Sequence, residues 1–414
     1  MEIPPRKTPA NTVFPERGFA ISYHITQKED SPLKPKLSNI RDFLRRADIL
    51  LFLLCLASSV IGIVIISSAT RSYNRPSMVY VQIAALIIGI VLYFLFTVID
   101  TDIIADQWPL LLVAEFALLL LLIPFGSEGD TGNRSWIRFL GIGIQPSEIV
   151  KVIYIVLSAK HISFLRDYRD LSSPFSVTQI AAHFGVLFLM ILGISGDLGN
   201  ALIFFFVFMV MMFVSGLKLY WFLFGGAGMA ILIPLAWNHI LSTRQKERIL
   251  APYDPTIDPD GYGVNWEPRQ ARLALSSGRL TGTGLYQGPQ TQSDAIDSKH
   301  ADYIFAAIGE ELGMIGCILV ILLLTAIILR CVYVGIRCRS TFGMLVCFGV
   351  AAAFFFQTFV NVGMCLGLTP VIGVALPFFS YGGSSLFTSF AAMGLVSGIH
   401  YKPKPTQYTS FADY

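Results

Sequence analysis

The stretch from Gly284 to Gly316 places carboxylates where a polar turn enters an apolar segment. Asp302 stands at the turn, and Glu310 and Glu311 follow within the apolar run. Charge this close to a membrane helix is costly unless something uses it. Asp302 fits either a helix cap, since acids favour helix N-termini, or a general base whose pKa is raised by partial desolvation. Asp302 is therefore the first candidate for acid–base chemistry, and at least one of the two glutamates is expected to be paired structurally.

Several cations near the apolar segments could meet an anionic group. Arginine binds phosphate and pyrophosphate through its bidentate fork, and a histidine beside Asp302 could relay a proton, although a lone histidine is more often a structural donor. The candidates for substrate binding are Arg134, Arg138, Arg272, Arg279, Lys299 and His300.

Two helix starts carry further polar candidates. Glu148 and Lys151 follow Pro146 and lie three residues apart, so they predict either a local ion pair or two groups facing an internal cavity. Ser384 lies in the run from Ser380 to Ser385, whose glycines and serines either pack backbones closely or expose N–H groups to a ligand. The sequence has no phosphate loop, zinc pattern or nucleophile elbow, and we predict no metal-binding residue.

The elements that must position these residues are membrane helices. Hydrophobic residues make up 54% of the 414 residues and charged residues only 14%, against roughly a quarter charged in soluble domains. The mean hydropathy is +0.64. This composition predicts an all-α polytopic membrane protein, and the net charge of +3 is too small to indicate nucleic acid as a partner.

About ten apolar runs approach the roughly 20 residues needed to cross a bilayer. Only three residues separate the fifth and sixth runs, and Asp197 among them is expected to cap the sixth helix. The polar, proline-containing residues 1–47 predict a disordered N-terminal tail, residues 48–400 the transmembrane domain, and residues 401–414 a C-terminal tail. The runs are residues 49–68, 77–98, 107–125, 148–162, 179–195, 199–215, 219–238, 303–329, 341–362 and 382–400.

Lysines and arginines in the short loops predict the orientation, because they are retained on the cytoplasmic side. Most of them fall on one side if both termini are cytoplasmic. Residues 239–302 then form a large extracytoplasmic loop between the seventh and eighth helices, too long for a simple connection. Within it, residues 269–280 could form a short helix on the membrane surface.

Taken in order, these motifs resemble the SEDS family of peptidoglycan glycosyltransferases, the RodA, FtsW and SpoVE group. The resemblance covers the chain from the first predicted helix to the last. This chain has His300-Ala301-Asp302-Tyr303 where the family usually reads His-Thr-Asp-Phe, and Asn200 where threonine is usual. The matching segments are Arg134–Ile137, Gln145–Glu148 with Lys151, Asp197–Gly199, Gln270–Leu275, Lys299–Ala306, Gly309–Gly313 and Leu376–Ser385.

The resemblance implies a ten-helix enzyme of the bacterial cytoplasmic membrane that polymerises lipid II at the outer face, with Asp302 at the position of the essential aspartate. Lipid II carries its sugar on a diphosphate, so the leaving group needs charge neutralisation and the acceptor hydroxyl needs a base. A divalent cation, Mg²⁺ or Mn²⁺, could add neutralisation, although no ligand cluster in the sequence indicates one. The implied partners are lipid II, lipid-linked glycan and a transpeptidase of the class B penicillin-binding proteins.

Two other functions stay open as alternatives. A lipid II transporter, or flippase, would need charged residues through the full membrane depth, whereas the candidates here concentrate in the outer half. A non-catalytic scaffold for a transpeptidase would have no need of Asp302. Residues 361–370 resemble the elongation type, RodA, which we favour, whereas the long N-terminal tail resembles the division type.

Overall fold

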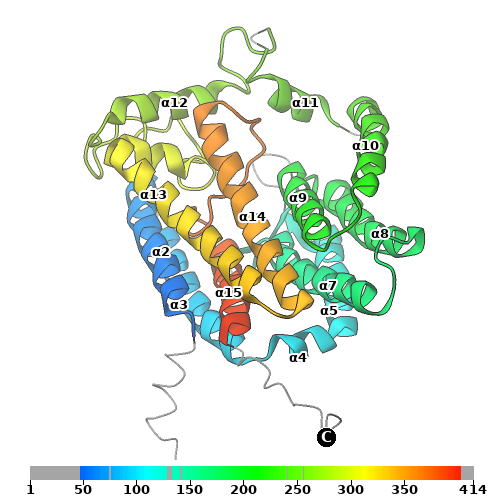
Figure 1. The fold of residues 1–414 in the computed structure, drawn as a ribbon. Coiled ribbons are helices and arrows are strands. Elements are labelled where there is room, and N and C mark those ends of the chain that lie inside the picture. Colours follow the sequence, from blue (N-terminus) through cyan, green and yellow to red (C-terminus); the bar gives the residue numbers. More distant parts are fainter. Residues whose placement is uncertain are drawn as a thin grey trace, which may run out of the picture. The chain divides into compact units, whose positions relative to one another are not determined.

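The computed structural model describes residues 47–73, 76–127, 133–139, 142–239, 241–254 and 256–401 (Figure 1). The N-terminal tail predicted for residues 1–47 lies outside the described residues except for its last member, Ala47, and the predicted C-terminal tail does so from residue 402 onward. The described part is built almost entirely from helices, as the composition predicts.

A helix stands at each of the ten apolar runs. Helix α5 is continued by the short helix α6 (Leu122–Phe125), and α8 by a π-helical turn, η1 (Ile191–Ser195). The ten helices are α2 (Ile49–Ala69), α3 (Ser77–Val98), α5 (Trp108–Leu120), α7 (Pro146–Tyr168), α8 (Pro174–Met190), α9 (Leu198–Val214), α10 (Leu219–His239), α13 (Ile304–Arg337), α14 (Thr341–Leu366) and α15 (Gly383–Tyr401).

Seven spans in the described part of the chain are long and apolar enough to cross a membrane. They comprise α2, α3, α5 with α6, α8 with η1, α10, α13 and α14. Helix α9 is apolar but has only 17 residues, and α7 and α15 are not among the seven. The protein is therefore a polytopic helical membrane protein, and the full number of ten crossings stays a prediction.

Helix α14 lies at the centre of the packing, and α10 lies at its edge (Figure 1). Of the most apolar 18 residues, 67% are buried in α14 and none in α10. Helix α14 packs against α13, α9, α7 and α15. Phe222 of α10 packs against the core, but exposed side chains such as Leu223 and Ile231 need lipid around them, so α10 presents most of its surface to the bilayer.

The contact between α3 and α15 depends on glycines. A Cβ at Gly394 would lie 2.6 Å from the carbonyl oxygen of Tyr93, and one at Gly398 would lie 2.8 Å from that of Phe96. Small residues allow the close backbone approach that stabilises helix pairs in lipid. These glycines lie in the C-terminal half of α15 and pack that half closely against α3.

Helix α13 is broken at Gly313, whose φ of 70° and ψ of −166° are not helical. A left-handed φ is accessible to glycine at little cost. The backbone N–H groups of Met314 and Ile315 donate to the carbonyls of Arg279 and Leu280 instead of to their own helix. The segment after α12 thus satisfies the backbone groups that the break frees, which ties the long α10–α13 connection to the start of α13.

Three short helices complete the fold, and two of them lie within the long α10–α13 connection. Helix α4 (Thr101–Asp106) follows α3, and α11 (Thr243–Leu250) and α12 (Trp266–Gly278) lie between α10 and α13. Helix α12 corresponds to the surface helix expected at residues 269–280. Its buried residues include Gln270, Ala271 and Ala274, so that face packs against protein.

A small antiparallel sheet leads into α7, and the sequence did not predict it. Its strands, in the order β1-β2-β3, are β1 (Gly126–Ser127), β2 (Trp136–Phe139) and β3 (Ile142–Ile144). Strands of two to four residues are too short to show a two-residue period. The sheet ends directly before Gln145, the N-cap residue of α7.

Candidate active site

A cavity of about 910 Å³ lies where the α11–α12 segment meets the ends of α7, α9, α14 and α15. This volume lies within the range of roughly 300–1,000 Å³ that is usual for ligand sites. Six acids and three arginines line it, so its wall is rich in charge of both signs. These residues are Glu148, Asp197, Glu247, Glu267, Asp297 and Asp302, with Arg138, Arg244 and Arg248.

The backbone around Asp302 is held by three hydrogen bonds from residues far along the chain. The carbonyls of three consecutive residues, His300–Asp302, accept hydrogen bonds. Their donors are the Tyr381 N–H at 2.8 Å, Ser380 Oγ at 2.7 Å and Asn361 Nδ2 at 2.8 Å, respectively. Asp302 is thereby fixed at the cavity wall before the first residue of α13.

Asp302 is not the cap of α13. The N-cap position belongs to Tyr303, and no side chain accepts a hydrogen bond there. No hydrogen bond to the Asp302 carboxylate is found among the residues that the structure describes. Of the two interpretations open from the sequence, capping is therefore not observed, and the carboxylate is available to a ligand.

Burial raises the pKa of Asp302 to about 6, and the negative charges of Glu267 and Asp197 add to the rise, whereas Arg248 opposes it. A base is most useful when its pKa lies near the working pH. Asp302 is thus ionised at neutral pH and still basic enough to accept a proton.

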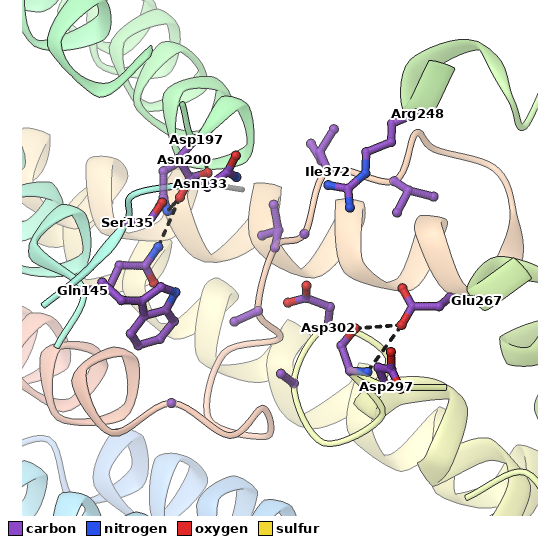
Figure 2. A pocket seen from close by; sticks show the side chains of 18 of the residues that line it. Asn133, Ser135, Gln145, Asp197, Asn200, Arg248, Glu267, Asp297, Asp302 and Ile372 are labelled. Carbon is purple, nitrogen blue, oxygen red and sulfur yellow. Dashed lines mark hydrogen bonds between the residues drawn. The ribbon is translucent and has the colours of Figure 1, made fainter. Parts of the chain in front are cut away.

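A second polar group forms around Asp197 on the opposite side of the cavity from Asp302 (Figure 2). Asp197 Oδ1 accepts a hydrogen bond from the Asn200 N–H at 3.0 Å, which is the helix cap expected from the sequence. Its Oδ2 accepts from Asn200 Nδ2 at 2.8 Å and from Gln145 Nε2 at 3.1 Å. Burial raises the pKa of Asp197, and the hydrogen bonds from Asn200 lower it.

Glu148 and Lys151 form an ion pair of 2.9 Å, with side chains only 5% and 6% exposed. Glu148 lines the large cavity, whereas Lys151 reaches a small neighbouring void. The pair therefore combines both sequence interpretations, since it is local and one member faces the cavity.

The remaining predicted binding residues divide into those that the fold brings to the cavity and those that it does not. Arg138 and His300 line it. Ser384 lies just behind the wall, where its Oγ accepts a hydrogen bond from the Gln145 N–H at 3.1 Å. The exposed residues Arg134, Arg272 and Arg279 are not among the described residues that line the cavity.

Lys299 is fully buried behind the loop and not in the cavity wall. Its Nζ donates to Ser72 Oγ at 2.7 Å and to the Ser293 carbonyl, and it lies 4.5 Å from the centre of the Tyr73 ring. Burial lowers the pKa of this ammonium group. The structure thus uses Lys299 to hold the segment that leads to Asp302.

Glu310 and Glu311 also hold this segment. The Glu310 carboxylate accepts hydrogen bonds from the N–H groups of Gln290 and Thr291, and Glu311 accepts one from Ser68 Oγ at 2.6 Å. Neither glutamate is among the described residues that line the cavity. Both carboxylates have structural partners, as expected for at least one of them.

The arginines of α11 are the site residues that the sequence analysis missed. Arg244 and Arg248 lie one helical turn apart, and both line the cavity. The N-terminus of α11 has a capping box, in which the side chains of Ser242 and Gln245 bond each other's backbone N–H groups. Gln245 Nε2 also lies 3.4 Å from the Gly196 carbonyl. A serine followed three residues later by glutamine is a helix-start signal that could have placed both arginines on one face.

The side chains that could bind a metal ion are not grouped among the residues that the structure describes. Among the described residues, no three His, Cys, Asp or Glu side chains lie close enough together to hold a metal ion. A dedicated site needs several such ligands at once. The described side chains therefore do not by themselves form a protein-made metal site.

Comparisons with known proteins agree on one family. Residues 46–404 match the FtsW/RodA/SpoVE family model, described as "cell cycle protein". The chain is 31% identical over 354 residues to the peptidoglycan glycosyltransferase MrdB of Escherichia coli K12, covering 84% of this chain and 92% of that one. It is 32% identical over 364 residues to a probable peptidoglycan glycosyltransferase FtsW of Trichlorobacter lovleyi, covering 85% and 92%.

Solved structures show the same relationship. A chain from a peptidoglycan synthase complex, studied for the coordination of polymerisation and crosslinking, superposes with a TM-score of 0.69 at 28% identity, covering 86% of this chain and 97% of that one. The rod shape determining protein RodA of Thermus thermophilus superposes with a TM-score of 0.60 at 27% identity, covering 86% and 96%. The protein therefore belongs to the FtsW/RodA/SpoVE family, the SEDS proteins.

Proposed function

We propose that this protein is a peptidoglycan glycosyltransferase that polymerises lipid II, with Asp302 as the general base. The observation that carries the proposal is the Asp302 carboxylate, which has a pKa of about 6 and lies in the wall of a large cavity that also holds three arginines. The family relationship supports the same activity. Formation of glycan polymer from lipid II by the purified protein, with and without a transpeptidase partner, tests it.

The chemistry follows from the charges in the cavity. Asp302 takes the proton from the acceptor sugar hydroxyl while that oxygen attacks the anomeric carbon of the donor sugar. The bond between this carbon and the diphosphate oxygen breaks, and the electron pair leaves on the lipid diphosphate. Arg138, Arg244 and Arg248 are placed to neutralise its charge, since fixed cations stabilise charge that develops in the transition state.

The position of the cavity favours an enzyme over a transporter. Gln145 and Glu148 begin α7, Asp197 and Asn200 begin α9, and Asp302 precedes α13, so the charged groups gather at one end of the helices. A transporter needs a site near the middle of the membrane that opens to both sides. The described charges instead suit chemistry on a lipid head group at one surface.

We expect Arg248 and not Arg272 to meet the diphosphate. Arg248→Gln should weaken lipid II use roughly ten- to a hundredfold, because losing a charged hydrogen bond costs about 1.5–3 kcal/mol. The matched control is Arg272→Gln, since this exposed arginine of α12 does not line the cavity. The measurement is the rate of polymer formation against lipid II concentration. Equal losses in both variants would show that the anion binds elsewhere.

We further propose that the protein lies in the bacterial cytoplasmic membrane with both termini inside, as the distribution of lysine and arginine in the short loops supports. Residues 239–302 are then outside. Asp258 is a poor labelling position, because its carboxylate accepts hydrogen bonds from Gly261, Gly263 and Asn265. A cysteine introduced at the exposed Asp260 should instead react with an impermeant reagent in intact cells. The control is the same protein without the introduced cysteine. Labelling of a cysteine at Lys402 in place of Asp260 would reverse the orientation.

The expected partner is a transpeptidase of the class B penicillin-binding proteins. The supporting observation is the similarity to a chain solved within a peptidoglycan synthase complex. A polymerase that hands its product to a crosslinking enzyme would place the outer face of the cavity next to that enzyme. Elongation remains the proposed setting. The identities to relatives named MrdB and FtsW, 31% and 32%, are nearly equal and do not distinguish elongation from division.

A further inference from the structure

The hydrogen bonds of Asp197 fix the orientation of two amide side chains. A carboxylate accepts hydrogen bonds and donates none when it is ionised. The amide nitrogens of Asn200 and Gln145 therefore face Asp197 Oδ2, at 2.8 Å and 3.1 Å. Their amide oxygens must point away from it. The assignment of oxygen and nitrogen thus follows from the partner and leaves no freedom to flip.

This orientation leaves the Asn200 oxygen as a buried acceptor without a donor. Asn200 lines the cavity, and only 6% of this residue is exposed. Its Oδ1 accepts no hydrogen bond from any residue in the described ranges. A buried polar atom left without a partner is destabilising, so Asn200 Oδ1 is an acceptor that a ligand with a donor would satisfy.

The oxygen atoms around Asp197 disfavour a phosphate at this point of the cavity and suit a sugar. A phosphate offers mainly acceptor oxygens, which Asn200 Oδ1 and the Asp197 carboxylate would repel. A hexosamine ring carries an acetamido N–H and several hydroxyls, and its C–H face is apolar. Trp136 and Ser135 also line the cavity, and the indole ring offers an apolar face to which the C–H face of a sugar can pack.

We propose that Asn200, together with Gln145, Ser135 and Trp136, forms a subsite for an N-acetylhexosamine ring, with Asn200 Oδ1 accepting a hydrogen bond from the acetamido N–H. Figure 2 shows Asn200, Gln145 and Ser135 on one side of the cavity and Arg248, Glu267 and Asp302 on the other. The subsite rests on the proposed function and refines it. It separates recognition of the sugar from neutralisation of the diphosphate.

The test is a binding cycle between protein and ligand. Lipid II binding is measured in the Asp302→Asn background, so that no turnover interferes, with Asn200 intact and with Asn200→Thr. Threonine can still donate to Asp197 but lacks the amide oxygen, and Asn200→Ala serves as the second variant. The ligands are lipid II and two 2-deoxy analogues, in which hydrogen replaces the acetamido group of one ring or the other.

Asn200→Thr should weaken binding of lipid II roughly two- to twelvefold, the range of one neutral hydrogen bond. It should have no further effect on the analogue that lacks the acetamido group of the ring in this subsite. An unchanged affinity for lipid II, or the same loss with lipid II and with both analogues, would overturn the proposal. If the protein with both Asn200 and Asp302 intact neither binds nor polymerises lipid II, the proposed function itself fails, which is a different outcome.

Discussion

Asp302→Asn should abolish polymerisation of lipid II and leave the protein folded. Asparagine has the same shape, and the three hydrogen bonds that hold residues 300–302 go to backbone carbonyls that the substitution leaves in place. A general base contributes typically ~10²–10⁴-fold to the rate. Residual polymer should therefore fall below the detection limit of most gel assays.

The stability of the same variant separates lost chemistry from lost structure. Folding raises the pKa of Asp302 from 3.8 to about 6, mainly by burial. The stability of the folded state therefore falls as the pH rises between these two values and stays lowered above them. A neutral amide removes this penalty, and the thermal unfolding midpoint of Asp302→Asn should not fall. If the purified variant polymerises lipid II at nearly the wild-type rate, Asp302 is not the base. Glu267, which lines the same cavity, then becomes the next candidate.

The pKa of Asp302 also predicts the pH dependence of the reaction. The base must be ionised to accept a proton, so activity should fall as the pH drops through about 6 and reach a plateau above it. After burial itself, the negative charge of Glu267 makes the largest contribution to this rise in the pKa of Asp302. Glu267→Gln should shift the midpoint to lower pH, and an unshifted profile would assign the titration to another group.

The membrane helices could be predicted from the sequence because each apolar run is a local signal. Ten runs and ten helices coincide, and even α12 was visible as a short amphipathic segment. The break at Gly313 was not, since a glycine within an apolar run reads as helix. Its non-helical backbone depends on carbonyls of Arg279 and Leu280, which lie more than 30 residues earlier in the chain.

The site was predictable to the extent that its residues stand at helix starts. Asp302 and Glu148 were found in this way, and Arg138 was found as a cation near the apolar segments. All three line the cavity. The choice between arginines was not predictable, because the long α10–α13 connection holds five of them. Its fold turns Arg244 and Arg248 to the cavity, whereas Arg272 stays exposed on α12.

The Glu148–Lys151 pair should show the second large effect, this time on stability. Both side chains are almost fully buried and bond each other at 2.9 Å. Lys151→Met leaves a buried carboxylate without its cation, and breaking such a pair typically costs about 3–5 kcal/mol. The variant should unfold at a clearly lower temperature in detergent than the wild-type protein.

The matched control replaces both partners. Glu148→Gln with Lys151→Met removes the charge together with its counter-charge, and uncharged replacements of a buried pair are often neutral or stabilising. The double variant should therefore recover most of the lost thermal stability, and a loss equal to or greater than that of Lys151→Met would contradict the pairing. Polymerisation measured on the stable double variant then isolates the role of the cavity face. If Glu148 orients substrate there, the recovered protein stays impaired, whereas a purely structural pair would return activity together with the fold.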